Sequence, residues 1–206
     1  MSDLFLGAFL TLLDYKLVVG DSLVGLLPGV LGWILVVRGL RRMSEEEPAA
    51  AGILKRPIRI AKCLIPASGI LYLIDLLGVD SSSYGHISRI QSLMLQAGME
   101  RAMDWIHLAV IVAGIAVMLI GYEVWWGCAE AVIRVEMNQG WKLGGSLMKE
   151  MLKAVIVVQI FVLVITTMLP AESVRMVGMF ANWAVVICFL STIDRTRSAF
   201  FRGMWL

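Results

Sequence analysis

The feature that most limits how this chain folds is an uninterrupted apolar run over residues 108–120, which is one of several such runs separated by charged stretches. The 206-residue chain is 59% hydrophobic and 17% charged, with a mean hydropathy of +0.83. Soluble domains are about half apolar and about a quarter charged, so an ordinary soluble globule is excluded. The sequence predicts an all-α, polytopic transmembrane helical bundle, with residues 1–206 forming one integral membrane domain.

Six candidate membrane segments follow one another along the chain. They cover residues 4–19, 23–40 and 63–79, a stretch that begins at 105 and continues past 126, and residues 153–169 and 174–193. The first segment is short for a bilayer once Asp14 and Lys16 are discounted. Five membrane helices plus a re-entrant or interfacial helix is therefore the alternative to six.

Two patterns predict how these segments pack. Gly25, Gly29 and Gly32 in the second segment favour close approach to a neighbouring helix. The last two segments are separated by a very short turn, which predicts an antiparallel pair. Their uncharged polar residues, Gln159 and Asn182 among them, are expected to bond between helices rather than to line a substrate pocket.

The positive charges predict the orientation, because cytoplasmic loops retain an excess of Lys and Arg. Residues 41–57 are expected to form a cytoplasmic charged loop, and residues 127–149 a cytoplasmic helix extension and loop. Residues 80–104 are expected to form an external polar loop that carries a short amphipathic helix. This arrangement predicts a multi-pass protein of the cell (inner) membrane, of bacterial type, with a cytoplasmic C terminus and, if the first segment spans, a cytoplasmic N terminus.

Ionisable groups inside the membrane segments are the first candidates for a functional site, because they are costly in hydrocarbon without a partner or water. Asp75 shares a helix face with Ser68 and Tyr72, and Asp14 shares one with Thr11. The two carboxylates would meet in the outer half of the bundle, where repulsion favours a shared proton or a bound cation. The structural alternative is a carboxylate near the outer interface that is hydrogen-bonded to a neighbouring helix.

A polar face and a basic cluster are predicted on the cytoplasmic side. Glu123, Glu130 and Arg134 recur at helical spacing, and Glu130 with Arg134 is expected to form an ion pair. The polar face is interpreted either as a solvated, salt-bridged helix extension or as a vestibule or partner-docking helix. The basic cluster, expected to face lipid or a protein partner, comprises Arg41, Arg42, Lys55, Arg56, Arg59 and Lys62.

Other polar residues do not predict a cofactor. Glu100, Asp104 and His107 have helical spacing, but they lack a second His and lie at a helix start that favours acidic residues anyway, so no metal site is predicted. The three cysteines are far apart and are expected to be small buried hydrophobes. A net charge of +2 does not indicate nucleic acid as a partner.

Three functional hypotheses follow. The first is a transporter-like or channel-like unit, or the membrane subunit of a larger complex, with membrane lipids and either further copies of the chain or another protein as partners. The second is a structural or regulatory protein that binds a partner or anionic lipid through its basic cytoplasmic face. The third is an intramembrane enzyme, which the sequence does not favour because the common hydrolase, zinc-protease and nucleotide motifs are missing.

Overall fold

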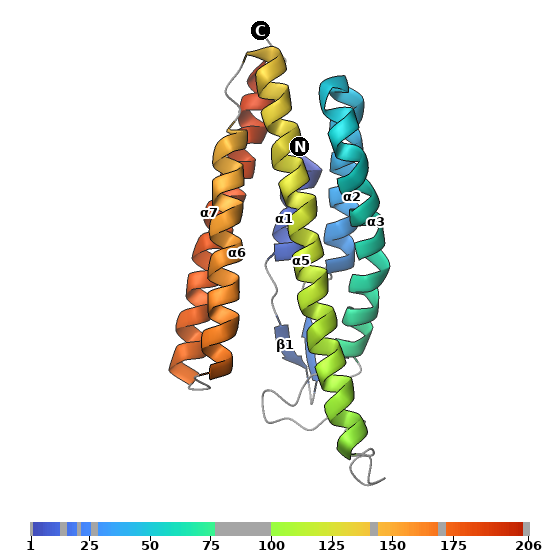
Figure 1. The fold of residues 1–206 in the computed structure, drawn as a ribbon, viewed down its shortest axis with the longest axis vertical. Helices are drawn as coiled ribbons and strands as arrows, with labels where there is room; N and C mark the ends of the chain where they lie inside the picture. The colour runs from blue at the N-terminus through green and yellow to red at the C-terminus, as the bar shows by residue number, and fades with distance from the viewer. Residues whose placement is uncertain are drawn as a thin grey trace.

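The computed structural model describes residues 2–12, 16–19, 22–25, 29–76, 100–140, 144–168 and 172–203. Long helices dominate these residues (Figure 1). In chain order the elements are α1 (Ser2–Leu12), β1 (Lys16–Val19), β2 (Ser22–Gly25), α2 (Gly29–Glu46), α3 (Pro48–Leu76), α5 (Glu100–Gln139), α6 (Gly145–Met168) and α7 (Glu172–Gly203). The helical architecture predicted from the sequence is confirmed for this part of the chain.

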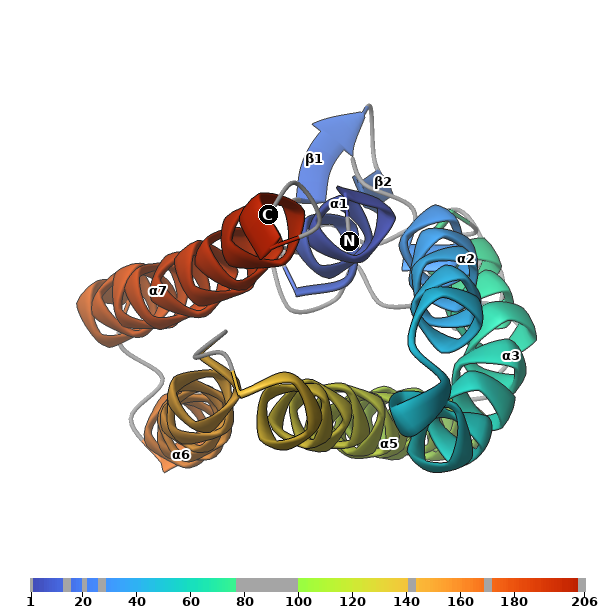
Figure 2. The same cartoon turned by 90° about the horizontal axis from the view of Figure 1, so that it is seen from above.

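The helices are arranged as a ring. Each described helix lies against the next one along the chain, and α7 also contacts α1 (Figure 2). Neighbours within the ring run antiparallel, as Figure 1 shows for α2 with α3 and for α6 with α7. The hydrogen bond from Gln159 Nε2 to Asn182 Oδ1, at 2.8 Å, joins α6 to α7 and confirms the predicted pair.

Three described helices contain a stretch that is long and apolar enough to cross a membrane. The stretches are Pro48–Ile74 in α3, Val112–Gln139 in α5 and Met176–Ala199 in α7. The first predicted segment is not one helix over residues 4–19, because α1 ends at Leu12 and residues 16–19 form β1. A helix of 11 residues rises only about 16 Å, about half of a hydrocarbon core.

The short ribbon between α1 and α2 was not predicted. β1 and β2 pair antiparallel with Lys16 opposite Gly25 and Val19 opposite Ser22. In the sequence, two residues separate the paired ends of the strands. The second predicted segment is therefore divided, with a strand before Pro28 and a helix after it.

Residues 41–57 do not form the expected loop. α2 continues to Glu46 and α3 begins at Pro48, so only Glu47 lies between the two helices. The backbone N–H of Ala50 donates to the carbonyl of Glu47 at 2.9 Å, which closes the first turn of α3. Proline is well suited to the first position of a helix because its missing N–H would have no helical partner there.

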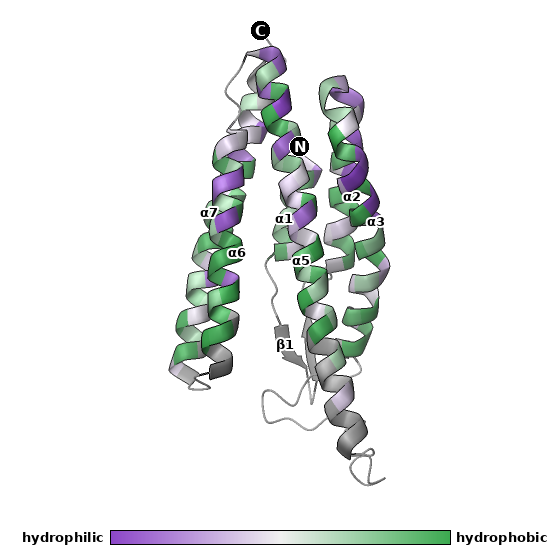
Figure 3. Cartoon of the chain, in the orientation of Figure 1, coloured by the Kyte–Doolittle hydropathy of each residue, from purple (hydrophilic) through white to green (hydrophobic). Residues whose placement is uncertain are grey.

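Burial is concentrated in one half of the bundle. On α5 the buried side chains lie between Tyr122 and Val135, and on α6 between Met148 and Val155. The other half exposes large apolar side chains, such as Val112, Val157 and Phe180. Figure 3 shows hydrophilic residues gathered toward the upper ends of the helices and hydrophobic ones below. Apolar side chains that face away from the bundle are expected where lipid, rather than water, is the solvent.

Candidate functional site at the charged rim

The charged side chains of α2 and α3 stop at the same height. Gly29 of α2 packs beside Ser68 of α3, with an added Cβ 3.8 Å from the serine Cβ. Because the helices are antiparallel, Arg38 and Arg59, each nine residues from that contact, lie level with each other. Lys62 is the last basic residue of α3 before its apolar part.

On two further helices, α5 and α6, the charged residues also end near this height. Glu123 is the first acidic residue above the apolar part of α5, and its carboxylate forms an ion pair with Arg56 of α3. Lys153 is the last charge of α6, one turn below Lys149, which contacts Glu130 of α5 at 3.2 Å. We call the charged upper part of the bundle, bounded below by Arg38, Lys62, Glu123 and Lys153, the charged rim.

Three uncharged stretches of the sequence have the same length. Residues 105–122, 154–171 and 176–193 are three stretches of 18 residues without Asp, Glu, Lys or Arg. A helix of that length rises about 27 Å. The hydrocarbon core of a bilayer is about 30 Å thick. The uncharged stretches of α5 and α7 are therefore about as long as a hydrocarbon core is thick.

Ion pairs connect neighbouring helices across the rim. Arg38 Nε lies 3.3 Å from Asp3 Oδ2, which joins α2 to α1. The pairs Arg56–Glu123 and Lys149–Glu130 join α5 to α3 and to α6. These side chains are partly exposed, so each pair contributes at most about 1 kcal/mol. Because all three pairs join neighbouring helices at one height, they help to define which helices are neighbours. They add little to the free energy of unfolding.

The predicted pair between Glu130 and Arg134 is wrong. The Glu130 carboxylate accepts hydrogen bonds from Trp126 Nε1 at 2.9 Å and from Lys149 Nζ at 3.2 Å. Lys149 Nζ also lies 4.2 Å from the centroid of the Trp126 ring, in a cation–π contact. Arg134 is exposed. A partner on another helix replaces the local one because α6 brings Lys149 close to the same carboxylate.

The intramembrane candidates are not assembled into a polar site by the described residues. The Thr11 hydroxyl donates to the Gly7 carbonyl of its own helix at 2.9 Å. Ser68 is buried beside Gly29, and Tyr72 is half-buried. Asp14 and the side chain of Asp75 lie outside the described residues. The proposed carboxylate pair therefore remains a prediction.

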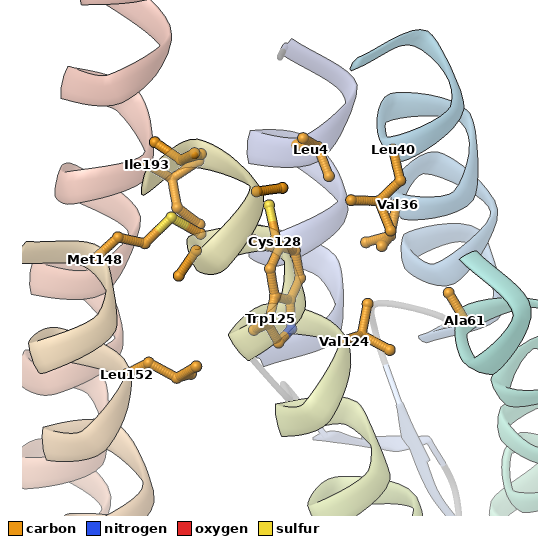
Figure 4. Close-up of a cluster of buried hydrophobic side chains, with 14 of the residues drawn as sticks. Leu4, Val36, Leu40, Ala61, Val124, Trp125, Cys128, Met148, Leu152 and Ile193 are labelled. Atoms are coloured by element: carbon orange, nitrogen blue, oxygen red, sulfur yellow. The ribbon is translucent and has the colours of Figure 1, made fainter. Parts of the chain in front are cut away.

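The centre of the ring, just inside the rim, is an apolar aromatic core. Trp125 is 1% exposed, and its ring centroid lies 6.4 Å from that of Trp33 and 6.1 Å from that of Phe189. Figure 4 shows Trp125 and Cys128 of α5 between Leu4 of α1 and the side chains of α6. Two adjacent tryptophans are typical of a belt at a membrane interface, but Trp125 lies in the core instead. Its neighbours come from α2 and α7, which no local pattern reveals.

A small cavity lies within the described part of the core. A cavity of about 10 Å³ lies beside Trp125 and Cys128 and also touches Leu4, Val132, Met148, Ile193 and Thr196. A volume of that size holds at most one water molecule. Such a cavity is too small for a substrate or for a column of water along the ring axis.

The basic cluster does not act as one group. Arg42 contacts Glu46 at 2.9 Å on α2, and Arg56 pairs with Glu123. Lys55, Arg59 and Lys62 are exposed on α3 and have no ion pair among the described residues. Arg41 is exposed on α2. The cluster therefore contains two cations with acidic partners, Arg42 and Arg56, and a row of three cations on α3 without an ion pair among the described residues.

No family model, curated protein or solved structure matches this chain. The part of the chain that the structure describes holds no group of three or more metal-ligating side chains. The side chains of Glu100, Asp104 and His107 lie outside the described residues.

Sequence reasoning missed several rim residues. Glu136 accepts hydrogen bonds from the backbone N–H groups of Gly144 and Gly145, and thus caps the start of α6. Gln139 Nε2 donates to Glu47 Oε1 at 2.7 Å and ties the end of α5 to the α2–α3 connection. The cap follows a detectable signal, an acidic side chain before a glycine-started helix. The contact with Glu47 has no sequence signal.

The expectation that all three cysteines are buried is wrong for two of them. Cys128 is buried in the core, whereas Cys63 and Cys188 are exposed on α3 and α7. All three lie in apolar sequence. Apolar neighbours do not distinguish a buried cysteine from one on an outward apolar helix face.

This difference predicts selective modification. In open membrane fragments, a charged, water-soluble maleimide is expected to modify Cys63, which lies at the lower edge of the rim, because only the thiolate reacts and water must reach it. Cys128 in the core and Cys188 within an uncharged stretch should stay unmodified until the protein is denatured in dodecyl sulfate. Peptide mass spectrometry measures all three sites. Rapid modification of Cys128 in the native protein would show that the core is open to water.

Proposed function

We propose that this chain is a multi-pass membrane protein that serves as a non-conducting scaffold, the membrane subunit of a larger assembly. The observation that carries the proposal is the aromatic core that fills the ring at the height of the rim. Trp33, Trp125 and Phe189 come from α2, α5 and α7, on different sides of the ring. A transporter needs a polar route at this point, and the side chains here are apolar and closely packed.

The charge pattern supports the placement in a membrane. The uncharged stretches of α5 and α7 match the thickness of a hydrocarbon core, and the rim above them carries most of the basic residues. By the positive-inside rule the rim faces the cytoplasm, together with the C terminus and the start of α1. α1 and the ribbon then form a re-entrant element, because α1 alone is too short to cross.

The surface of the bundle supports a scaffold role. Large apolar side chains on α6 and α7, including Phe161 at 60% and Val177 at 69% exposure, remain outside the ring. In a membrane they meet either lipid chains or the helices of other subunits. The rim offers ion-paired helix ends to the cytoplasm, where a soluble partner can reach them.

A flux measurement tests the proposal. The purified chain is reconstituted into vesicles that enclose a pH-sensitive dye, and proton and K⁺ movement is compared with that in empty vesicles. We expect no difference, because the core gives neither ion a hydrated path. Flux that falls with Asp75→Asn or Asp14→Asn would overturn the scaffold and support the transporter hypothesis.

A second measurement concerns the assembly. Native membranes are extracted without detergent in polymer discs, and the mass of the particle is determined by light scattering with the lipid and polymer mass subtracted. A scaffold subunit should be found in particles whose protein mass exceeds the 22.7 kDa of one chain. Isolated monomers throughout would contradict the proposed role even if no flux occurs.

A further inference from the structure

The outward face of α3 carries a line of cations that the rim leaves unpaired. Lys55, Arg59 and Lys62 recur at spacings of four and three residues, and all three are exposed. None of them has an ion pair among the described residues, whereas Arg42 and Arg56 each have an acidic partner. An unpaired cation keeps its full attraction for an anion from outside the protein.

The same face of α3 continues as an apolar strip. Pro66 is exposed, and Ile70 and Leu73 are 60% and 56% exposed. At 100° per residue these three and the three cations lie within a sector of about 80°. The opposite face is buried against the bundle through Ala50, Leu54, Pro57, Ala61, Leu64 and Ser68.

The height of the cations corresponds to a membrane surface. Arg59 is level with Arg38, where the charges of α2 end. From Lys62 to Leu73 the helix rises about 16 Å. One leaflet of a hydrocarbon core is about 15 Å thick, half of about 30 Å. The face therefore presents positive charge at the level of lipid headgroups and apolar surface along the length of one set of acyl chains.

The geometry points to a binding site for an anionic phospholipid on this face of α3. The lipid phosphate lies against Arg59 and Lys62, and an acyl chain follows Pro66, Ile70 and Leu73. Arginine matches a phosphate with two parallel N–H donors, and lysine adds a point charge. An acidic protein segment would match the cations but would offer no apolar surface to the strip, so a lipid is favoured.

This inference goes beyond the proposed function, because a non-conducting scaffold needs no preference among lipids. The two proposals share only the height of the membrane surface. Their tests are independent, since one measures ion flux and the other measures lipid binding.

The test compares two variants with the same change in net charge. One carries Lys55→Gln, Arg59→Gln and Lys62→Gln. The control carries Arg42→Gln, Lys153→Gln and Arg197→Gln, three rim cations that each pair with an acid on their own helix, namely Glu46, Glu150 and Asp194. The full chain in neutral detergent is titrated with phosphatidylglycerol or phosphatidylcholine, and native mass spectrometry measures the bound lipid.

The wild-type chain and the control are expected to prefer phosphatidylglycerol. Each cation near the surface contributes about fivefold to the attraction, so the α3 variant should lose about 100-fold of this preference. Circular dichroism should show the same helicity in all three proteins, because the replaced side chains are exposed or, at Arg197, half-buried at the rim. The proposal fails if the wild type shows no preference, if the α3 variant keeps it, or if the control loses as much.

An acidic peptide tests the other class of partner. A poly-glutamate peptide added at equal charge should not displace the bound phosphatidylglycerol, because it cannot occupy the apolar strip. Displacement by the peptide, or peptide binding without any lipid binding, would assign this face to a protein partner and overturn the inference.

Discussion

Trp125→Ala should lower the free energy of unfolding by about 3 kcal/mol, measured by dodecyl sulfate titration in mixed micelles. Replacing a buried aromatic residue by alanine costs about 3 to 5 kcal/mol in soluble cores. The lower value is expected here, because separating helices in an apolar solvent exposes less surface to water. The loss comes from the ring contacts with Trp33 and Phe189, which connect three helices of the ring.

Two further variants show whether the aromatic contacts are responsible. Trp105→Ala changes the same residue type on the same helix, at 71% exposure, and should alter stability by less than about 0.5 kcal/mol. Trp125→Phe keeps a ring in place and removes an indole N–H that is buried without a hydrogen-bond partner among the described residues. It should therefore cost much less than alanine. Equal losses at Trp105 and Trp125 would contradict the packed core.

The helices themselves could be predicted from the sequence, because apolar runs of membrane length have few other solutions. Which side of each helix is buried and which faces outward could not be predicted. Trp125 and Trp126 are adjacent in the sequence, yet the first lies in the core while the second is half-buried and bonds Glu130 at the rim. In a soluble protein hydrophobicity itself marks the core. In a membrane protein both sides of a helix are apolar, so the pattern loses this information.

Charged residues were predicted better by position than by partner. The polar face with Glu123 and Glu130 does lie on one side of α5, but their partners, Arg56 and Lys149, come from two other helices. The sequence does predict at which end of the bundle they lie, because the charged residues flank long uncharged stretches. Which helix supplies each partner follows from the order of helices in the ring, which no single-sequence pattern contains.

Glycines on both helices allow a close contact in the ring between α1 and α2. A Cβ added at Gly7 would lie 2.9 Å from both the Gly32 carbonyl oxygen and the Val36 nitrogen, which are backbone atoms. A Cβ at Gly32 would lie 2.6 Å from Thr11 Cγ2. The predicted close packing of the second segment is confirmed at Gly32. Gly7→Ala is expected to destabilise the protein by about 2 kcal/mol, because backbone atoms cannot give way as a side-chain end can.

A matched substitution separates this clash from the intrinsic effect of alanine. Gly52 lies within α3, is exposed, and an added Cβ there meets nothing within 4 Å. Alanine favours a helix over glycine by about 1 kcal/mol, so Gly52→Ala should stabilise the protein while Gly7→Ala destabilises it. Dodecyl sulfate titration of both variants measures the two signs. If Gly7→Ala also stabilises, α1 does not approach α2 this closely and packs on the ring by another face.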